Sequence, residues 1–212
     1  MPADVPRHDD DSIPEEKRRG LEAASAWIRG RRSIKPADMS ERPVDQQLLE
    51  VLLENANWAP SHGQTEPWRF MVFRGEARVR LAGALQQVYR ETTVEADFRP
   101  EKLEKLGRNP LLAPVVIVVV MKRQVSGKIP RIEEIEAVAC AVQNLHLSAA
   151  AIGLGGYWSS PPFIYTDAMR NWLSLGSDDQ CLGLFYLGWP KAGSRWPEGR
   201  RRPVTDKIEW FD

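Results

Sequence analysis

The 212-residue sequence has few of the side chains that bind metal ions or form disulfides. It contains three histidines and only two cysteines, Cys140 and Cys181, which lie far apart and form no Cys-x-x-Cys pair. A disulfide framework needs several paired cysteines, and a zinc site needs closely spaced Cys and His ligands. The sequence therefore argues against both, and it favours a reducing, cytoplasmic compartment.

A net charge and a long apolar segment are also missing. The 29 Lys and Arg residues balance the 29 Asp and Glu residues, which removes the usual electrostatic reason to expect a nucleic-acid partner. The longest apolar run, residues 111–121, contains Pro114, and it is shorter than the ~18 residues that cross a bilayer. The Asp- and Pro-rich residues 1–14 lack the apolar centre of a secretory signal. We therefore expect neither a membrane span nor a nucleic-acid partner.

Length and composition predict one globular domain with an N-terminal extension. A typical domain has ~150 residues, so a chain of 212 residues fits one domain better than two. Residues 1–14 are predicted to form a disordered tail, and residues 15–212 to form the folded domain. No internal repeat or low-complexity tract divides this domain.

Helical and strand patterns alternate unevenly along the domain. Asp45 is placed to cap a helix that Pro60 ends, and Thr166 or Asp167 is placed to cap a short helix that ends at Leu175. Apolar residues at helical spacing predict four longer helices: residues 15–29, 46–59, 76–90 and 133–153. Apolar, β-branched runs predict three buried strands: residues 69–74, 115–121 and 182–187. Because the helices outnumber the strands, the pattern favours an α+β fold with a small sheet packed between helices.

Two basic clusters lie near opposite ends of the domain. Arg31, Arg32, Ser33 and Lys35 follow the first helix, and the second cluster contains four arginines: Arg195, Arg200, Arg201 and Arg202. Guanidinium, ammonium and hydroxyl groups suit an anionic ligand such as a phosphate. Each cluster alone also fits a solvated basic face. In a chain with no net charge, two such clusters are candidates to converge on one ligand.

A polar loop joins the second helix to the first strand. Residues 59–68 read Ala-Pro-Ser-His-Gly-Gln-Thr-Glu-Pro-Trp and carry many hydrogen-bonding side chains. Loops on a rigid scaffold often carry function, so His62 is a candidate site residue, although it equally fits an ordinary loop histidine. Trp68 is expected in the core.

A glycine-rich segment follows the long helix but does not fit dinucleotide binding. In residues 153–156 the third glycine of a Gly-x-Gly-x-x-Gly motif would fall on Trp158, and the segment follows a helix rather than a strand. We interpret the glycines as a left-handed helix C-cap. Trp158, Ser159 and Ser160 come next, and an aromatic face with two hydroxyls can lie against a flat heteroaromatic ring.

Four of these segments, taken in order, resemble one enzyme family. They are Arg-Arg-Ser-x-Lys at residues 31–35, the Ala-Pro-Ser-His loop that continues to Phe70, the helix whose Gln-Asn-Leu precedes Gly-Leu-Gly-Gly-x-Trp, and Arg-Arg-Pro at residues 201–203. Together they resemble the flavin-dependent nitroreductases, and within them the compact subgroup with a His in the Ala-Pro loop. The resemblance covers residues 27–210.

The resemblance implies a nitroreductase-like fold, with a small mixed or antiparallel sheet surrounded by helices, and an intertwined homodimer that holds FMN at the subunit interface. In such a fold, Arg31 and Ser33, with Arg32 beside them, would bind the phosphate and ribityl chain, and Arg201 would add a phosphate contact. Lys35 would approach the pyrimidine edge of the flavin, where a cation favours the reduced form. The other implied contacts are Trp158, Ser159 and Ser160, and, from the neighbouring subunit, Trp58, His62 and Gln64.

Two residues of the Ala-Pro loop depart from the family pattern. Gln64 stands where the family usually has Asn, so its amide is displaced by one methylene group. Glu66 stands where the family usually has Gln before Pro-Trp, and we interpret it as a structural residue.

The implied function is that of an FMN-dependent NAD(P)H oxidoreductase. Hydride from NADH or NADPH would reduce the flavin, and a small-molecule acceptor such as a nitroaromatic or quinone would then enter the same pocket in a ping-pong sequence. The cofactor carries the chemistry, so no side chain is required as a nucleophile or base; Ser148 is a candidate on the nicotinamide side. The alternatives are a non-catalytic flavin storage or sensor protein, a flavin-dependent dehalogenase, an oxygen-dependent flavin reaction and an interaction protein without cofactor.

Overall fold

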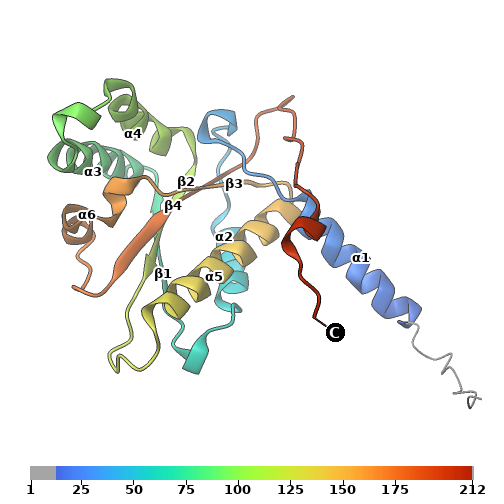
Figure 1. Ribbon diagram of the computed structural model, residues 1–212. Coiled ribbons are helices and arrows are strands. Elements are labelled where there is room, and N and C mark those ends of the chain that lie inside the picture. The colour runs from blue at the N-terminus through green and yellow to red at the C-terminus, as the bar shows by residue number, and fades with distance from the viewer. Residues whose placement is uncertain (1–12, 212) are drawn as a thin grey trace, which may run out of the picture.

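The computed structural model describes residues 13–211, and its centre is a four-stranded antiparallel sheet (Figure 1). The strands are β1 (Trp68–Arg74), β2 (Val115–Met121), β3 (Gly155–Ser159) and β4 (Gln180–Gly188), and their order across the sheet is β1-β2-β4-β3. The predicted α+β class with a small sheet is thereby confirmed. Most of the tail predicted at residues 1–14 lies outside the described residues.

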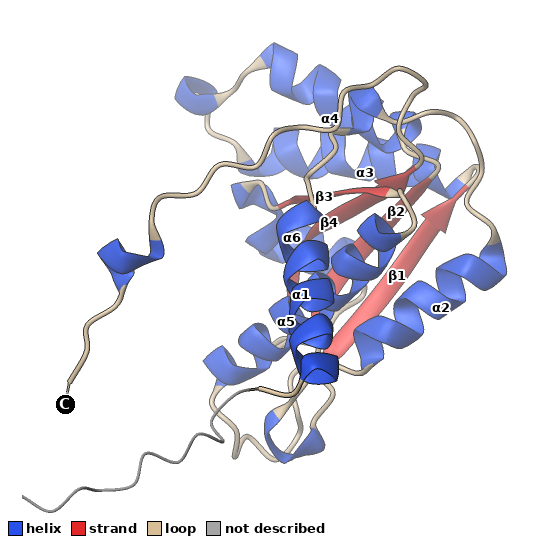
Figure 2. Ribbon diagram, turned by 90° about the vertical axis from the view of Figure 1, so that its right-hand side faces the viewer, coloured by secondary structure: helices blue, strands red, loops and turns tan. Residues whose placement is uncertain are grey.

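Helices cover both faces of this sheet, as Figures 1 and 2 show. One face packs against α2 (Gln46–Asn57) and α5 (Arg131–Ala151). The other face packs against α3 (Ala77–Thr92), α4 (Pro100–Leu112) and α6 (Asp167–Trp172). The sheet is therefore the middle of three layers, with a separate apolar cluster on each side.

The sequence of β2 accounts for this layering. All of its residues are buried. The odd-numbered residues from Val115 to Met121 belong to the cluster beneath α2 and α5, whereas the even-numbered residues from Val116 to Val120 belong to the cluster beneath α3, α4 and α6. Successive side chains of a strand point to opposite faces, so a strand covered on both faces requires an unbroken apolar run.

Several predicted helix ends are confirmed. The Asp45 carboxylate accepts a hydrogen bond from the backbone N–H of Leu48 at 3.1 Å, which makes Asp45 the N-cap of α2. Thr166 caps α6, which ends at Trp172 instead of Leu175. Gly153 has a φ of 80° just after α5, as a left-handed helix end requires.

Three features of the sheet and its cover differ from the sequence prediction. β1 was expected to be buried on both faces, but it is an edge strand with partly exposed residues such as Val72. β3 was not predicted as a strand, because it has only five residues and begins with two glycines. α4 was not among the predicted helices, and it buries Leu106 and Pro110. An apolar run alone does not distinguish an edge strand from a central one.

The two ends of the described chain leave apolar side chains uncovered. None of the residues of α1 (Glu15–Gly30) is buried by the rest of residues 13–211, and Trp27 and Ile28 are more than half exposed. Residues 191–211 are exposed throughout, and the end of this segment lies apart from the sheet and its helices (Figure 2). Over residues 13–211, no helix combines the length and hydropathy needed to cross a bilayer.

Candidate functional site

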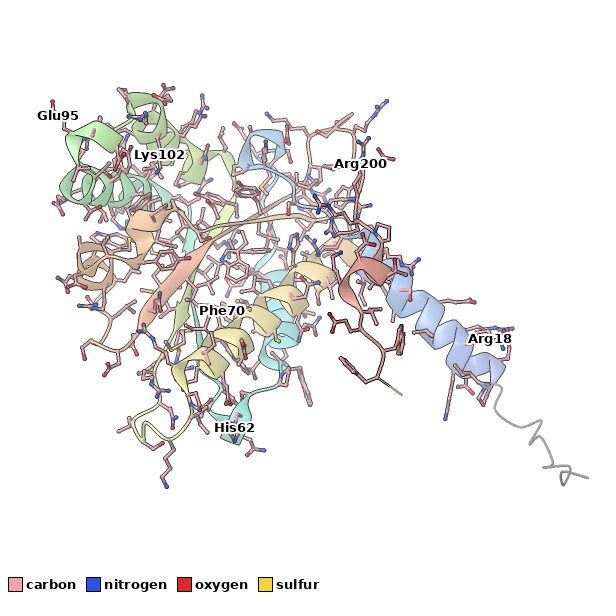
Figure 3. The ribbon with its side chains drawn as sticks, in the orientation of Figure 1. Arg18, His62, Phe70, Glu95, Lys102 and Arg200 are labelled. Atoms are coloured by element: carbon pink, nitrogen blue, oxygen red, sulfur yellow. The ribbon has the colours of Figure 1, made fainter. Side chains whose placement is uncertain are left out.

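A basic cavity lies where α1 ends. It has a volume of about 710 Å³ and is lined by Arg31, Arg32 and Ser33 from the segment after α1, by Gln143 from α5, and by residues 197–201 of the C-terminal segment. Figure 3 labels Arg200 on this side of the molecule. Residues of both basic clusters therefore line one cavity, whereas Lys35, Arg195 and Arg202 of the same clusters lie outside its lining.

Positive charge dominates the cavity. Its lining includes one carboxylate, Glu198, and five arginines: Arg29, Arg31, Arg32, Arg200 and Arg201. Glu198 forms an ion pair with Arg200 at 3.2 Å. Partial burial, together with the nearby charges of Arg201 and Arg32, lowers the pKa of the Arg31 guanidinium below its usual value. An anion bound among these groups would relieve their mutual repulsion.

Backbone pairing holds the segment after α1 beside β3. The backbone N–H of Ile34 donates to the carbonyl oxygen of Gly156 at 3.0 Å, and Ser33 forms a parallel bridge with Gly156. A Cβ atom on Gly155 would lie 2.7 Å from the Cβ atom of Ile34, so this close approach requires glycine. Ser33 is thereby placed two residues from the position of Trp158 along β3.

Trp158 forms a partly exposed aromatic surface on β3. It pairs with Phe185 of β4, and its side chain is 37% exposed. A Cβ atom on Gly183 would collide with the Trp158 indole, and Gly183 has a φ of 146°. Ser159 is partly buried and Ser160 follows the strand. These side chains lie on the strand that neighbours Ser33, but outside the lining of the basic cavity.

Arg32 forms hydrogen bonds that hold the C-terminal segment against the end of α1. Its guanidinium donates to the carbonyl oxygens of Pro197 at 2.7 Å, Arg29 at 2.5 Å and Arg31 at 2.8 Å. The indole N–H of Trp196 donates to the carbonyl oxygen of Gly30 at 3.0 Å. Arg32 therefore shapes the cavity by holding its wall, since its hydrogen bonds go to backbone carbonyls.

The Ala-Pro loop lies far from this cavity in the same chain. His62 Nδ1 is 2.6 Å from an oxygen of Glu133, which is in the first turn of α5, whereas the cavity-lining Gln143 comes ten residues later on that helix. At 1.5 Å per residue, this separation is about 15 Å along the axis. Figure 3 shows His62 and Arg200 on opposite sides of the molecule. One chain does not bring the two groups together.

Gln64 occupies an unusual backbone conformation within that loop. Gly63, Gln64 and Glu66 have φ angles of 60°, 53° and 42°, and positive φ is disfavoured for residues other than glycine. The backbone N–H of Glu66 donates to Ser61 Oγ at 3.3 Å, which helps to hold the loop. The loop therefore presents an exposed Gln64 side chain from a strained backbone.

The remaining predicted residues lie apart from the cavity. Trp58 is 79% exposed, and its indole N–H donates to Glu54 at 3.1 Å. Ser148 Oγ accepts a hydrogen bond from the Asn55 amide at 3.1 Å, an interaction between α5 and α2 that the sequence did not reveal. Lys35 is exposed and lies outside the cavity lining.

His146 is a residue near the cavity that sequence reasoning missed. It is 5% exposed on α5, between Arg31 and the backbone of Arg32. Burial, and secondarily the Arg31 charge, lowers the pKa of His146 from 6.5 to about 4, so the imidazole is neutral at pH 7. A polar residue in a helix of mostly small and apolar types was the available signal.

The two cysteines provide neither a metal site nor a reactive pair. Cys140 is exposed on α5, and Cys181 is buried on β4. Burial raises the pKa of the Cys181 thiol to about 11, which disfavours the thiolate. Within the described part of the chain, no group of three or more His, Cys, Asp or Glu side chains is arranged to hold a metal ion.

The neutral state of His146 predicts a pH-dependent stability. Above pH 6.5 the ring is neutral in both the folded and the unfolded chain, so burying it costs no stability through protonation. Between pH 6.5 and about 4 the unfolded chain binds a proton that the folded chain excludes, so the free energy of unfolding falls as pH falls, by up to about 3 kcal/mol. Urea unfolding of flavin-free protein, compared with His146→Asn, measures this contribution.

Wild-type protein is the reference for that measurement. His146→Asn should lose the pH dependence that lies between pH 4 and 6.5, because no imidazole titrates at that position. Equal pH dependence in the two proteins would contradict the burial of a neutral His146.

Comparison with known proteins places most of this chain in one family. Residues 28–189 match the nitroreductase family. The Escherichia coli (strain K12) protein named "Putative NAD(P)H nitroreductase YdjA" is 32% identical over 149 residues, which are 70% of this chain and 79% of YdjA. The Bacillus subtilis (strain 168) protein named "Putative NAD(P)H nitroreductase YfhC" is 27% identical over 183 residues, 85% of this chain and 90% of YfhC.

Solved structures show the same architecture. A nitroreductase-like family protein from Bacillus cereus is 30% identical and superposes with a TM-score of 0.72, covering 89% of this chain and 95% of its own. A Desulfovibrio desulfuricans protein, described as a putative nitroreductase in complex with FMN, is 25% identical and has a TM-score of 0.67, covering 89% and 97%. The resemblance read from the sequence is therefore confirmed, and the chain belongs to the nitroreductase family.

Proposed function

We propose that this chain is an FMN-dependent NAD(P)H oxidoreductase that reduces nitroaromatics, quinones or similar small acceptors. Family membership and a relative solved with FMN support this proposal. The observation that carries it is the basic cavity, in which Arg31, Ser33 and Arg201 come together from distant parts of the sequence.

The cavity fits the phosphate end of FMN. A phosphate monoester carries close to two negative charges at pH 7, and charge-assisted hydrogen bonds from Arg are strong phosphate contacts. Arg31 and Arg201 would supply the guanidinium groups and Ser33 a hydroxyl, while Arg32 would hold the C-terminal wall through the carbonyls that it already binds. A net-neutral chain thus concentrates positive charge at one place.

The other predicted residues would orient the flavin ring and the substrates. Trp158, Ser159 and Ser160 would lie against the flavin ring. Trp158 and Ser159 are on β3 and Ser160 follows it, and β3 is the strand that pairs with the Ser33 segment. Lys35 would supply a cation at the pyrimidine edge, and Ser148 would face the nicotinamide. Bound FMN would supply the redox chemistry, accepting hydride from NAD(P)H and delivering electrons to the acceptor in a second half-reaction.

The site would also need a second copy of the chain. His62 and Gln64 lie on the other side of the molecule from the cavity, and Trp58 is almost fully exposed. The uncovered apolar residues of α1 and of the C-terminal end, including Trp27 and Trp210, provide surface for association. We therefore propose an intertwined homodimer in which the loop of one protomer completes the cavity of the other.

Removing either phosphate-binding guanidinium should weaken FMN binding. Arg31→Ala and Arg201→Ala should each raise the Kd for FMN roughly 10- to 100-fold, the range expected for loss of one charge-assisted hydrogen bond. Quenching of FMN fluorescence measures the Kd. Arg202→Ala is the matched control, since it removes a neighbouring charge from outside the cavity lining, and it should change the Kd less than threefold. Wild-type affinity in both test variants would place the phosphate elsewhere.

Anaerobic addition of NADH or NADPH to the FMN-loaded protein should bleach the oxidised-flavin absorbance, because hydride transfer reduces the ring. A quinone or nitroaromatic added afterwards should restore the absorbance, and initial rates at varied concentrations of both substrates should give the parallel lines of a ping-pong sequence. A persistent oxidised spectrum would instead favour a storage or sensor protein. Halide release from a halogenated aromatic substrate would favour the dehalogenase.

A mixed dimer tests whether the site is shared between chains. Arg31→Ala and His62→Ala homodimers should each bind FMN weakly. Co-expression with two different tags yields mixed dimers, in which one site combines the intact Arg31 of one chain with the intact His62 of the other. One tight FMN site per mixed dimer is expected, and sedimentation should give twice the 24.0 kDa of the chain. Two weak sites in the mixed dimer would mean that His62 and Arg31 do not act across an interface.

A further inference from the structure

His146 is a buried polar residue that the proposed chemistry does not use. It packs against the Phe185 ring in a T-shaped arrangement, with the ring centroids 5.2 Å apart and the planes at 82°. A Cβ atom on Gly156 would lie 2.7 Å from His146 Cδ2, so the absence of a side chain at position 156 makes room for the imidazole. The surroundings of His146 are therefore shaped to its ring.

Its two hydrogen-bond partners determine its tautomer. A backbone carbonyl can only accept, so the 3.1 Å contact of Nε2 with the Arg32 carbonyl oxygen requires a proton on Nε2. A guanidinium can only donate, so the 3.3 Å contact of Nδ1 with Arg31 Nη1 requires an unprotonated Nδ1. The geometry assigns a neutral ring that donates to the backbone on one side and accepts from Arg31 on the other.

A neutral acceptor suits a place that is crowded with positive charge. The charged groups that face this ring are Arg31 and, beyond it, Arg201 and Arg32. A carboxylate in place of His146 would neutralise Arg31 and reduce its attraction for an anion. A neutral imidazole occupies one N–H of the guanidinium and leaves its charge intact.

We propose that His146 is a positioning residue that holds the Arg31 guanidinium in the basic cavity, so that preference for a phosphorylated flavin depends on a residue of the core. This inference rests on the proposed function, in which Arg31 binds the FMN phosphate. Riboflavin has the same ring without the phosphate, so the ratio of the two affinities measures the contribution of the phosphate contacts, and a change in this ratio in a His146 variant reports on those contacts.

Two substitutions at position 146 separate the acceptor from the packing. His146→Asn places an amide oxygen near the position of Nδ1, whereas His146→Leu fills the space without an acceptor. Both remove the Nε2–H donor to Arg32. His146→Leu should raise the Kd for FMN roughly tenfold, which corresponds to loss of about one hydrogen bond to a charged group, and should leave the Kd for riboflavin within twofold. His146→Asn should restore FMN binding to within threefold of wild type.

The Arg31→Ala background shows whether His146 acts through Arg31. There, His146→Leu should change the Kd for FMN less than twofold. An unchanged FMN affinity in His146→Leu, an equal loss for FMN and riboflavin, or the same tenfold loss in the Arg31→Ala background would overturn the proposal. The proposed function fails separately: in that case wild type would bind FMN no better than riboflavin, or Arg31→Ala alone would leave FMN binding unchanged.

A measurement on the wild-type protein covers the case in which a variant does not fold. With ¹⁵N-labelled histidine, the Nδ1 resonance of His146 should fall in the unprotonated range and that of Nε2 in the protonated range. Adding FMN should shift the Nδ1 resonance, because the phosphate would bind the Arg31 guanidinium that donates to Nδ1. Adding riboflavin should shift this resonance much less. A protonated Nδ1, or equal shifts with both flavins, would contradict the proposal.

Discussion

Repulsion among guanidinium groups is the constraint on which the site depends. Partial burial lowers the pKa of Arg31, and the nearby charges of Arg201 and Arg32 lower it further. The chain stabilises the cluster without neutralising it: Arg32 donates to three carbonyl oxygens, and His146 offers Arg31 a neutral acceptor. Carbonyls at the C-terminal end of α1 also carry the negative end of the helix dipole. The positive charge is thus kept available for an anion.

This arrangement requires three distant segments to meet at one edge of the fold. Ser33 and Ile34 pair with the backbone of β3 at Gly156, and residues 196–199 fold back on the end of α1. Glycines permit both contacts: Gly155 accommodates Ile34, and a Cβ atom on Gly199 would collide with the Arg32 guanidinium. The cavity is therefore a consequence of close backbone approaches, and larger residues at these glycines would separate its walls.

The sequence was informative where one local rule decides the structure. The β-branched run of β2, the Asp45 cap and the left-handed Gly153 each follow from local chemistry. The residue types of the two basic clusters pointed to part of the cavity lining. The sequence did not predict the features that depend on packing between distant segments. The exposure of β1 depends on which strand forms the edge, and the role of Arg32 in holding the C-terminal segment depends on the Pro197 carbonyl, 165 residues away. His146 was missed for the same reason, because its partners come from another segment.

The length of α5 explains why the candidate site is divided. Its first turn holds His62 through Glu133, and its later turns carry Gln143 and His146 beside the cavity. A rigid helix cannot shorten to bring these groups together, so any site that uses both must draw them from two chains. The positive φ angles of the loop are maintained by contacts within its own chain, to α5 and to Ser61. Strained backbone persists only where its surroundings hold it. In the proposed dimer, each protomer would therefore present this loop already formed to the cavity of the other.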